Sequence, residues 1–225
     1  MIYVGTATDK AFTILDKPVL EALDGFHRAL YESRSKGEIL SDYTVNGGMA
    51  VQSTMAYALT SNGDNPGDIT NIPGLKKTLR PTSDIDVSVS NADGIVGVYS
   101  SSLGREYIRD TEMGRNVRRF VFDRNAPDLD VHSVDDEFHL RMINEARDVT
   151  LRHKKDEYTF RVPKPEYIVA LKLFDVRPES KHFMDAQKLK AFERAGLLKV
   201  DEDLLGELLE LHFRSRAKLE TWQGL

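Results

Sequence analysis

We predict an α+β fold, in which a sheet flanked by helices is followed by a C-terminal helical unit. Two observations predict it. The first two thirds of the chain mixes alternating, strand-like segments with helical ones, whereas the last third carries helical periodicity alone. The change falls at Pro163 and Pro165, and prolines commonly punctuate the boundary between elements. We therefore divide the chain into domains at residues 1–162 and 163–225.

The composition is that of a globular protein and excludes several kinds of site. The chain has 225 residues, of which 40% are hydrophobic, so it can bury a core without disulfides. It contains no cysteine, which excludes disulfides and thiolate sites. We find no transmembrane run and no signal-peptide pattern, and we expect a cytoplasmic protein without a membrane partner. The net charge of −5 argues against a broad nucleic-acid-binding face.

The first expected element is a helix that begins after Asp16 and ends before Gly37. Asp16 suits the N-cap, Pro18 suits the first turn, and apolar residues recur at helical spacing through residues 20–30. A strand, a second helix and a loop rich in Gly, Asn, Asp and Pro are then expected at residues 43–45, 49–59 and 61–74. Whether this loop closes over a ligand stays open.

The later strands are predicted from alternation. In residues 84–90, Ile85, Val87 and Val89 share one face and leave two aspartates on the other. Further strands are expected at residues 117–122 and 128–134, a helix at 138–147, and a hairpin of 149–153 with 157–162. Helices are expected at residues 166–174, 181–195 and 201–219, and residues 94–110 are ambiguous.

Asp84 and Asp86 are the first candidates for chemistry. Residues two apart on a strand point to the same side, so these carboxylates lie side by side. Like charges at that distance repel unless a cation lies between them, and Mg²⁺ prefers such oxygen ligands. Acidic pairs are also common on solvated strands, so the pair alone leaves both interpretations open.

A second acidic strand offers a third carboxylate. Asp128 and Asp130 alternate with apolar residues as the first pair does. If the two strands are neighbours, three carboxylates can hold two metal ions about 3.5–4 Å apart, which activates an attacking oxygen and stabilises a phosphate leaving group. We prefer Asp130 because Leu129 and Val131 flank it in mid-strand, and Asp128 stays the alternative.

Gly47 and Gly48 join a strand to a helix. Glycines let the backbone approach a phosphate closely, and a helix start offers free N–H groups and the positive end of the dipole. A double glycine at such a junction is otherwise a tight turn. Its position ahead of the acidic strand makes it informative.

Taken in order, these motifs resemble the nucleotidyltransferase superfamily with the DNA polymerase β-like fold. The signature is a Gly-Gly turn, a helix and an acidic pair on the next strand. Arg80 and Ser83, which precede that pair, make the chain most similar to the AbiEii/MenA-type branch. The tail is similar too, with Lys172 on one helix and Asp185 in the run that opens the next. His182 stands where this branch usually has Asp.

The resemblance implies a mixed sheet and a metal-dependent enzyme that moves a nucleoside monophosphate from an NTP to an acceptor hydroxyl. The implied metal ligands are Asp84, Asp86 and Asp130, which with Lys172 form the catalytic set. The implied nucleotide contacts are Gly47, Gly48, Arg80, Ser83, Lys172 and Asp185. The implied cofactor is Mg²⁺ or Mn²⁺.

The same resemblance implies partners, and it leaves alternatives. The branch contains many toxins of toxin–antitoxin pairs, which implies a cognate antitoxin protein. Some of its members are similar to enzymes that add nucleotides to the tRNA 3′ end, which implies a tRNA or other RNA acceptor. An antibiotic, another small molecule or a protein side chain stays open as acceptor. One alternative is a nucleotide-binding regulatory or interaction module on this fold, which a missing third carboxylate would favour. Another is an enzyme whose acidic pair binds the metal of a nucleotide sugar.

The remaining candidates are interpreted structurally. Five histidines lack the spacing of a metal motif, so we expect ordinary surface or core side chains: His132, His139, His153, His182 and His212. We expect Trp222 to pack the last helix.

Overall fold

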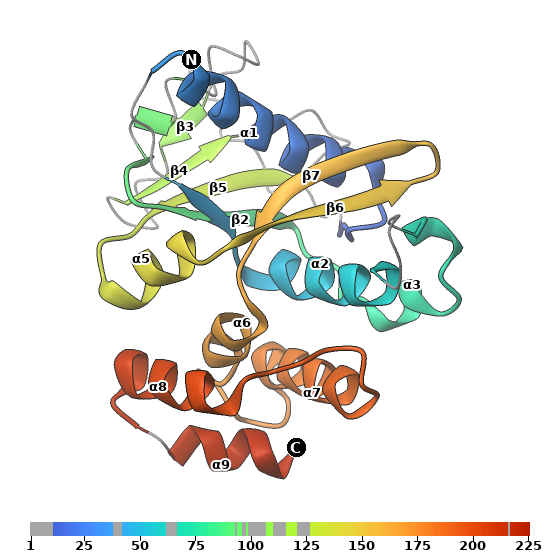
Figure 1. Cartoon of the computed structure of the whole chain (residues 1–225), viewed down its shortest axis with the longest axis vertical. Coiled ribbons are helices and arrows are strands. Elements are labelled where there is room, and N and C mark those ends of the chain that lie inside the picture. The colour runs from blue at the N-terminus through green and yellow to red at the C-terminus, as the bar shows by residue number, and fades with distance from the viewer. Residues whose placement is uncertain are drawn as a thin grey trace.

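The computed structural model has the predicted α+β architecture (Figure 1). It describes residues 11–37, 42–61, 67–92, 94–95, 98, 107–109 (backbone only), 116–120, 127–215 and 217–225. Within these ranges the strands are β1 (Tyr43–Val45), β2 (Asp84–Val89), β3 (Tyr107–Arg109), β4 (Val117–Phe120), β5 (Asp128–Ser133), β6 (Arg147–His153) and β7 (Asp156–Val162). The helices are α1 (Lys17–Ser35), α2 (Gly47–Thr60), α3 (Leu75–Thr78), α5 (Glu137–Asn144), α6 (Pro165–Lys172), α7 (Lys181–Arg194), α8 (Glu202–Phe213) and α9 (Ala217–Gly224), with a 3₁₀ turn at Ile69–Asn71.

The central sheet is mixed, with strand order β1-β2-β5-β4-β3. β2 and β5 pair in parallel, and the other neighbouring strands pair antiparallel. The alternation seen in the sequence gives β2 a fully buried apolar face of Ile85, Val87 and Val89. That face fixes the register, because a slip by one residue would turn it toward solvent. The polar face of β2 is therefore fixed as well.

Helices and a separate hairpin cover the sheet. β6 and β7 form a two-stranded sheet of their own, and α1 packs along β7 (Figure 1). The turn between β6 and β7 places Lys154 in the left-handed region of backbone conformation, at φ 59°. α2 packs against β2, which sets the start of α2 beside the polar face of that strand.

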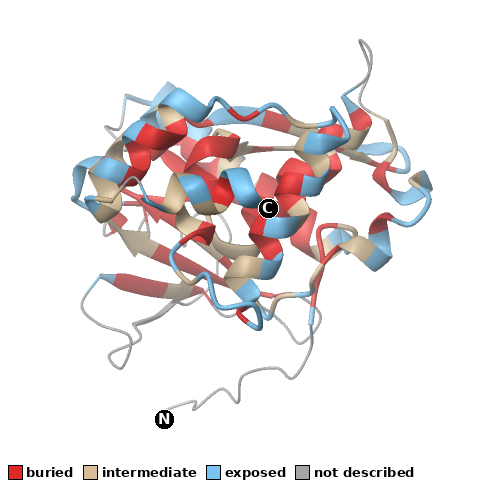
Figure 2. Cartoon of the chain, turned by 90° about the horizontal axis from the view of Figure 1, so that it is seen from below, coloured by how far each residue is buried: buried red, intermediate tan, exposed pale blue. Residues whose placement is uncertain are grey.

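The helices α6 to α9 lie together below the sheet in Figure 1. α6 packs on α7 and α8, while α2 and α5 contact this group from the sheet side. In Figure 2 these helices carry buried and exposed segments side by side, as helices packed along one face do. One cluster of buried apolar residues runs through both parts of the chain. The division at residue 162 stays a prediction.

Most predicted elements are confirmed, and one is wrong. The expected helix over residues 201–219 is two helices, because Arg214 adopts a left-handed backbone at φ 52° and ends α8. Asp16 stands at the N-cap of α1, but its carboxylate accepts the N–H of Thr13 at 2.6 Å rather than a helical N–H.

Some sequence expectations fall on residues outside the described ranges. These are the absence of a signal peptide in residues 1–10, part of the 61–74 loop, the end of the strand predicted at 117–122, and most of the ambiguous 94–110 segment. In the described ranges, no helix combines the length and apolar character that crossing a bilayer requires.

Trp222 holds the last helix against the core. Its side chain is fully buried, as expected for packing, and the ammonium of Lys190 lies 4.5 Å from the ring centre. We expect Trp222→Ala to lower the free energy of unfolding by about 3–5 kcal/mol, since it removes a large buried ring. Chemical denaturation followed by circular dichroism measures this. Tyr31→Ala is the control, because Tyr31 is 65% exposed, and a loss for Trp222→Ala no larger than the control's would contradict the packing role.

Candidate active site

Four aspartates meet on the polar face of the central sheet. In the parallel pairing of β2 with β5, Asp84 lies opposite Asp128 and Asp86 lies opposite Asp130. Side chains two apart on a strand share a face, so the two acidic pairs form one cluster. The sequence hypothesis that the two acidic strands are neighbours is confirmed.

Asp130 is the most enclosed member of the cluster. It is 1% exposed, and both of its carboxylate oxygens accept hydrogen bonds of 2.6 Å from the guanidinium of Arg119. Arg119 lies opposite Asp130 on β4. Bidentate, charge-assisted hydrogen bonds of this kind are stronger than neutral ones. One negative charge of the cluster is thus neutralised from within the fold.

His132 completes this face of β5. Its Nε2 lies 3.0 Å from Asp86 Oδ1, and Asp86, Asp130 and His132 each place a ligand atom within 4.8 Å of the others. Burial lowers the pKa of His132, but the hydrogen bond to Asp86 and the surrounding aspartates outweigh it and raise the pKa above its ordinary value. Sequence reasoning missed His132, although its position two residues after Asp130 puts it on the same face.

Asp84 lies in surroundings that disfavour its negative charge. Burial raises the pKa of Asp84, the charges of Asp86 and Asp130 raise it further, and the hydroxyl of Thr82, which donates to Asp84 at 3.0 Å, opposes the rise. A raised carboxyl pKa means that the negative charge is disfavoured there, so an added cation would be stabilising.

Gly47 makes room for Asp86. It adopts φ 61°, and a Cβ built on it would lie 2.3 Å from Asp86 Oδ2. Asn46 caps α2 by accepting the Gly47 N–H at 2.7 Å. At Gly48 a Cβ would lie 3.1 Å from the guanidinium of Arg80. The start of a 14-residue helix therefore opens directly onto the acidic strand.

A cationic group faces the cluster from the helical side. The guanidinium of Arg80 donates to both oxygens of Asp185, at 3.2 and 2.9 Å, and Lys172 Nζ lies 3.1 Å from the same carboxylate. Burial raises the pKa of Asp185, but Arg80 and Lys172 outweigh it and lower the pKa. Burial lowers the pKa of Lys172 by more than Asp185 raises it. Two cations share one anion, which leaves a surplus positive charge.

Both groups border one cleft of about 320 Å³ between the sheet and the helical unit. Of the residues predicted from sequence, Gly47, Asp86 and Lys172 line it. Asp84 and Asp130 flank Asp86 in the sheet, while Arg80 and Asp185 stand behind Lys172 as its ion-pair network. Gly48 lies beside Arg80, and Ser83 is exposed at the start of β2.

The helical wall of the cleft is apolar and aromatic, and sequence reasoning missed it. Its lining residues there include Ile168, Leu171, Phe174, His182 and His212. Phe174 is exposed, and its ring meets His182 edge-on at 6.4 Å. Burial, together with Lys172, lowers the pKa of His182, which favours a neutral imidazole at this wall of the cleft.

The donor set fits a hard divalent cation. Asp84 and Asp86 are only partly buried and offer carboxylate oxygens on one side, which are the ligands that Mg²⁺ prefers. The space that Asp86 occupies exists because residue 47 has no side chain. Asp130 is nearby, but Arg119 holds both of its oxygens.

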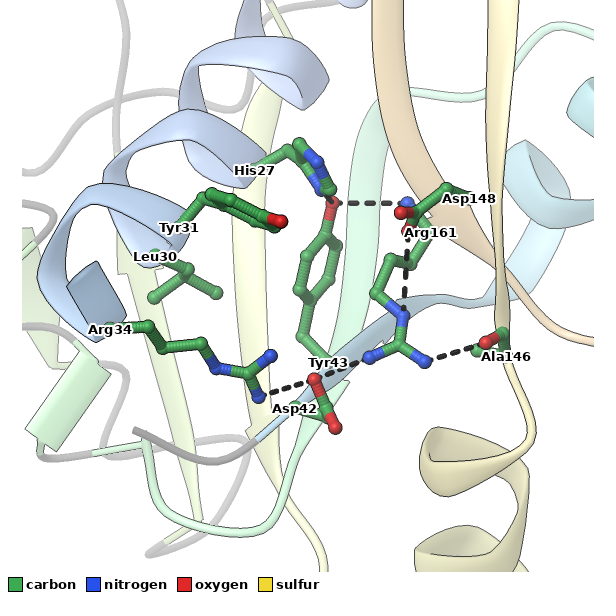
Figure 3. Close-up of a pocket in the computed structure, with 9 residues that line it drawn as sticks. All are labelled: His27, Leu30, Tyr31, Arg34, Asp42, Tyr43, Ala146, Asp148 and Arg161. Atoms are coloured by element: carbon green, nitrogen blue, oxygen red, sulfur yellow. Dashed lines mark hydrogen bonds and ion pairs between the residues drawn. The ribbon is translucent and has the colours of Figure 1, made fainter. Parts of the chain in front are cut away.

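A second cavity, of about 270 Å³, lies between α1 and the hairpin (Figure 3). Asp42 pairs with both Arg34 and Arg161, and the Tyr43 hydroxyl lies between His27 Nδ1, at 3.1 Å, and the backbone N–H of Arg161, at 3.0 Å. These groups pair with one another, so we interpret this cavity as the junction that ties α1 to the hairpin.

The close approach of Gly47 to Asp86 predicts the outcome of two glycine substitutions. Gly47→Ala would place a methyl group 2.3 Å from Asp86 Oδ2, at a positive φ, and we expect it to weaken Mg²⁺ binding at this carboxylate by more than about tenfold. Gly25→Ala is the matched control, because nothing lies within 4 Å of its added Cβ in mid-helix, and it should stabilise the fold by about 0.5–1 kcal/mol. Calorimetric titration measures the first effect. Equal affinities of the two variants would contradict this account of Gly47.

The buried Arg80–Asp185–Lys172 network predicts a pH-dependent stability. We expect Asp185→Asn to cost about 3–5 kcal/mol at pH 7, since it leaves two cations without their carboxylate. The folded pKa of Asp185 lies below its ordinary 3.8, so the stabilisation is complete above about pH 4 and is lost as the pH falls through the folded pKa.

Urea denaturation of wild type and Asp185→Asn between pH 3 and 8 measures this difference. Glu179→Gln is the control, because Glu179 is an exposed acid just ahead of α7. The prediction would be contradicted if the difference in free energy of unfolding between wild type and Asp185→Asn stayed constant down to pH 3.

No family model matches the chain, and no curated protein matches it. Solved structures are similar at low identity. The antibiotic-resistance factor ANT(2'')-Ia is 16% identical, with 90% of this chain and 97% of that chain covered and a TM-score of 0.43. An antigenic nucleotidyltransferase-like protein from Paracoccidioides brasiliensis is 13% identical, with 94% and 95% covered and a TM-score of 0.44. JHP933 from Helicobacter pylori is 16% identical, with 91% and 95% covered and a TM-score of 0.32.

Proposed function

We propose that the chain is a metal-dependent nucleotidyltransferase that moves a nucleoside monophosphate from an NTP to an acceptor hydroxyl and releases pyrophosphate. The observation that carries this proposal is the in-register pairing of Asp84 and Asp86 with Asp128 and Asp130, of which Asp86 lines the cleft. The opposite side of that cleft carries surplus positive charge at Lys172. Phosphoryl-type transfer depends mainly on positioning and charge neutralisation, which such a cleft supplies.

The acidic side of the cleft would hold the metal. Asp84 and Asp86 would bind Mg²⁺ or Mn²⁺, and Asp130 would provide the third carboxylate. When bound, the metal would neutralise phosphate charge and make the acceptor oxygen more nucleophilic. His132 orients Asp86 through its 3.0 Å hydrogen bond, and Arg119 holds Asp130.

The triphosphate would lie between the α2 start and the helical unit. The backbone N–H at Gly48 and the dipole of α2 favour phosphate oxygens. Gly47, whose own N–H is donated to Asn46, would let the phosphate approach closely, and Ser83 would contribute a hydroxyl from the start of β2. Lys172 and Arg80 would balance the remaining charge. Asp185 is a positioning residue in this proposal, because it touches both cations and holds them at one edge of the cleft.

The acceptor is proposed from the sequence resemblance. An RNA hydroxyl, with tRNA as the first RNA to test, follows from the AbiEii/MenA-type motifs, as does a cognate antitoxin protein. The net charge of −5 favours a small RNA footprint over a broad one.

One observation favours a second candidate function. Both oxygens of Asp130 are already bound by Arg119, and a site whose third carboxylate is occupied suits a module that binds nucleotide without transferring it. The two functions differ in one measurable property, which is whether the nucleoside monophosphate part of the NTP is transferred to an acceptor.

A transfer assay tests the proposal. Purified chain is incubated with Mg²⁺ or Mn²⁺ and each of four α-labelled NTPs, with and without total tRNA. We expect label on RNA, and a loss of more than about 100-fold in Asp84→Asn/Asp86→Asn, since even indirect partners of a metal contribute 10–100-fold. Asp135→Asn is the control, because this exposed acid lies outside the cleft.

The other outcomes decide between the candidates. Label on the chain itself would keep the transferase and identify a protein hydroxyl as acceptor. Metal-dependent NTP binding without transfer, lost in the double variant and kept in Asp130→Asn, would support the module. If the chain neither binds NTP nor transfers label from it, both candidate functions are wrong.

A further inference from the structure

A second group of metal-ligand side chains lies at the junction of α5 and α8. Asp136, His139 and His212 each offer one ligand atom, and these atoms all lie within 4.8 Å of one another. Asp136 is the N-cap of α5 and His139 lies in its first turn, whereas His212 comes from the end of α8 in the helical unit. The group shares no residue with the acidic cluster on the sheet.

Ring contacts hold the His212 imidazole in place, and hydrogen bonds hold that of His139. His212 stacks on Phe138 with ring centres 4.3 Å apart and meets Phe213 edge-on, also at 4.3 Å. His139 Nδ1 lies 2.6 Å from Asp136 Oδ2, and the other oxygen of Asp136 accepts the His139 N–H. An ion bound by His139 Nδ1 and Asp136 would take the place of the proton that these two atoms share, since imidazole nitrogen and carboxylate oxygen are both zinc ligands.

The spacing of the two rings suits a shared ion. A ring nitrogen 2.0–2.1 Å from zinc puts the ring centre roughly 3.2 Å from the metal, so two rings at a tetrahedral angle have centres roughly 5 Å apart. The ring centres of His139 and His212 are 5.5 Å apart, with planes inclined at 84°. Helix capping accounts for the Asp136–His139 pair, but it gives no reason for a third ligand to arrive from α8.

We propose that Asp136, His139 and His212 bind a borderline transition-metal ion of the Zn²⁺ class, which cross-links α5 to α8. Two imidazole nitrogens and one carboxylate favour Zn²⁺, Co²⁺ or Ni²⁺, whereas Mg²⁺ prefers oxygen ligands alone. Asp136 is exposed and the two histidines are partly exposed, so an ion has access from solvent. His212 also lines the cleft, and the ion would therefore fix one wall of it.

Cobalt binding tests the site without reference to catalysis. The full chain is stripped with a chelator and titrated with Co²⁺ under excess Mg²⁺, which saturates oxygen-rich sites. We expect one equivalent of Co²⁺ with visible absorption bands of a nitrogen-ligated, low-coordinate ion. His139→Gln and His212→Gln should each weaken this binding by more than tenfold, since each removes a ligand.

Two controls separate this site from the one on the sheet. His182→Gln removes a histidine of the same cleft that lies outside the group, and Asp84→Asn/Asp86→Asn removes the proposed Mg²⁺ ligands. Both should keep the cobalt bands, and in both a rise in melting temperature with Co²⁺ should persist while His212→Gln abolishes it. No bound Co²⁺ under Mg²⁺, or binding lost in the aspartate variant and kept in His139→Gln, would overturn the proposal.

Discussion

The candidate site depends on the in-register, parallel pairing of β2 with β5. This pairing places Asp84 and Asp86 level with Asp128 and Asp130. Bringing these carboxylates together is unfavourable by itself, and the fold offsets the cost by burying the apolar faces of both strands. The burial also fixes the register, since a slip of one residue would expose those faces. The fold therefore holds these carboxylates together, with Asp130 paired to Arg119 and with Asp84 in surroundings that disfavour its negative charge, where an added cation would be stabilising.

The other half of the site comes from a different part of the chain. Lys172 ends α6, Asp185 lies in α7, and Arg80 belongs to the segment that leads into β2. Their ion-pair network spans the contact between the sheet and the helical unit. The positions of the two cations at the cleft therefore depend on how α6 and α7 pack against the sheet. A buried network of this kind contributes little when complete and is costly when one member is removed. The network acts here by positioning, because it holds the two cations opposite the aspartates.

The part of the site that depends on local strand alternation could be predicted from the sequence. Alternation in residues 84–90 put Asp84 and Asp86 on one face, and the same rule applied to residues 128–134 would have added His132. Arg119 could not be found in that way, because its place opposite Asp130 depends on how β4 aligns with β5. His212 and Phe174 also join the cleft only through tertiary packing. The break at Arg214 escaped prediction because a left-handed backbone at a non-glycine residue has no clear local signature.

Whether Asp130 takes part in chemistry turns on its ion pair with Arg119. The two side chains differ in their surroundings, since Asp130 is 1% exposed and Arg119 is 25% exposed. A guanidinium with access to water recovers hydration when it leaves, whereas a carboxylate left alone in the interior does not. The pair can therefore open only by movement of Arg119, and only when another cation takes its place beside Asp130. Under the proposed function, a metal ion bound with the nucleotide would supply that cation, and the phosphates would supply an anion for Arg119. On this reasoning the ion pair is compatible with a catalytic third carboxylate, and it makes the use of that carboxylate conditional on a loaded cleft.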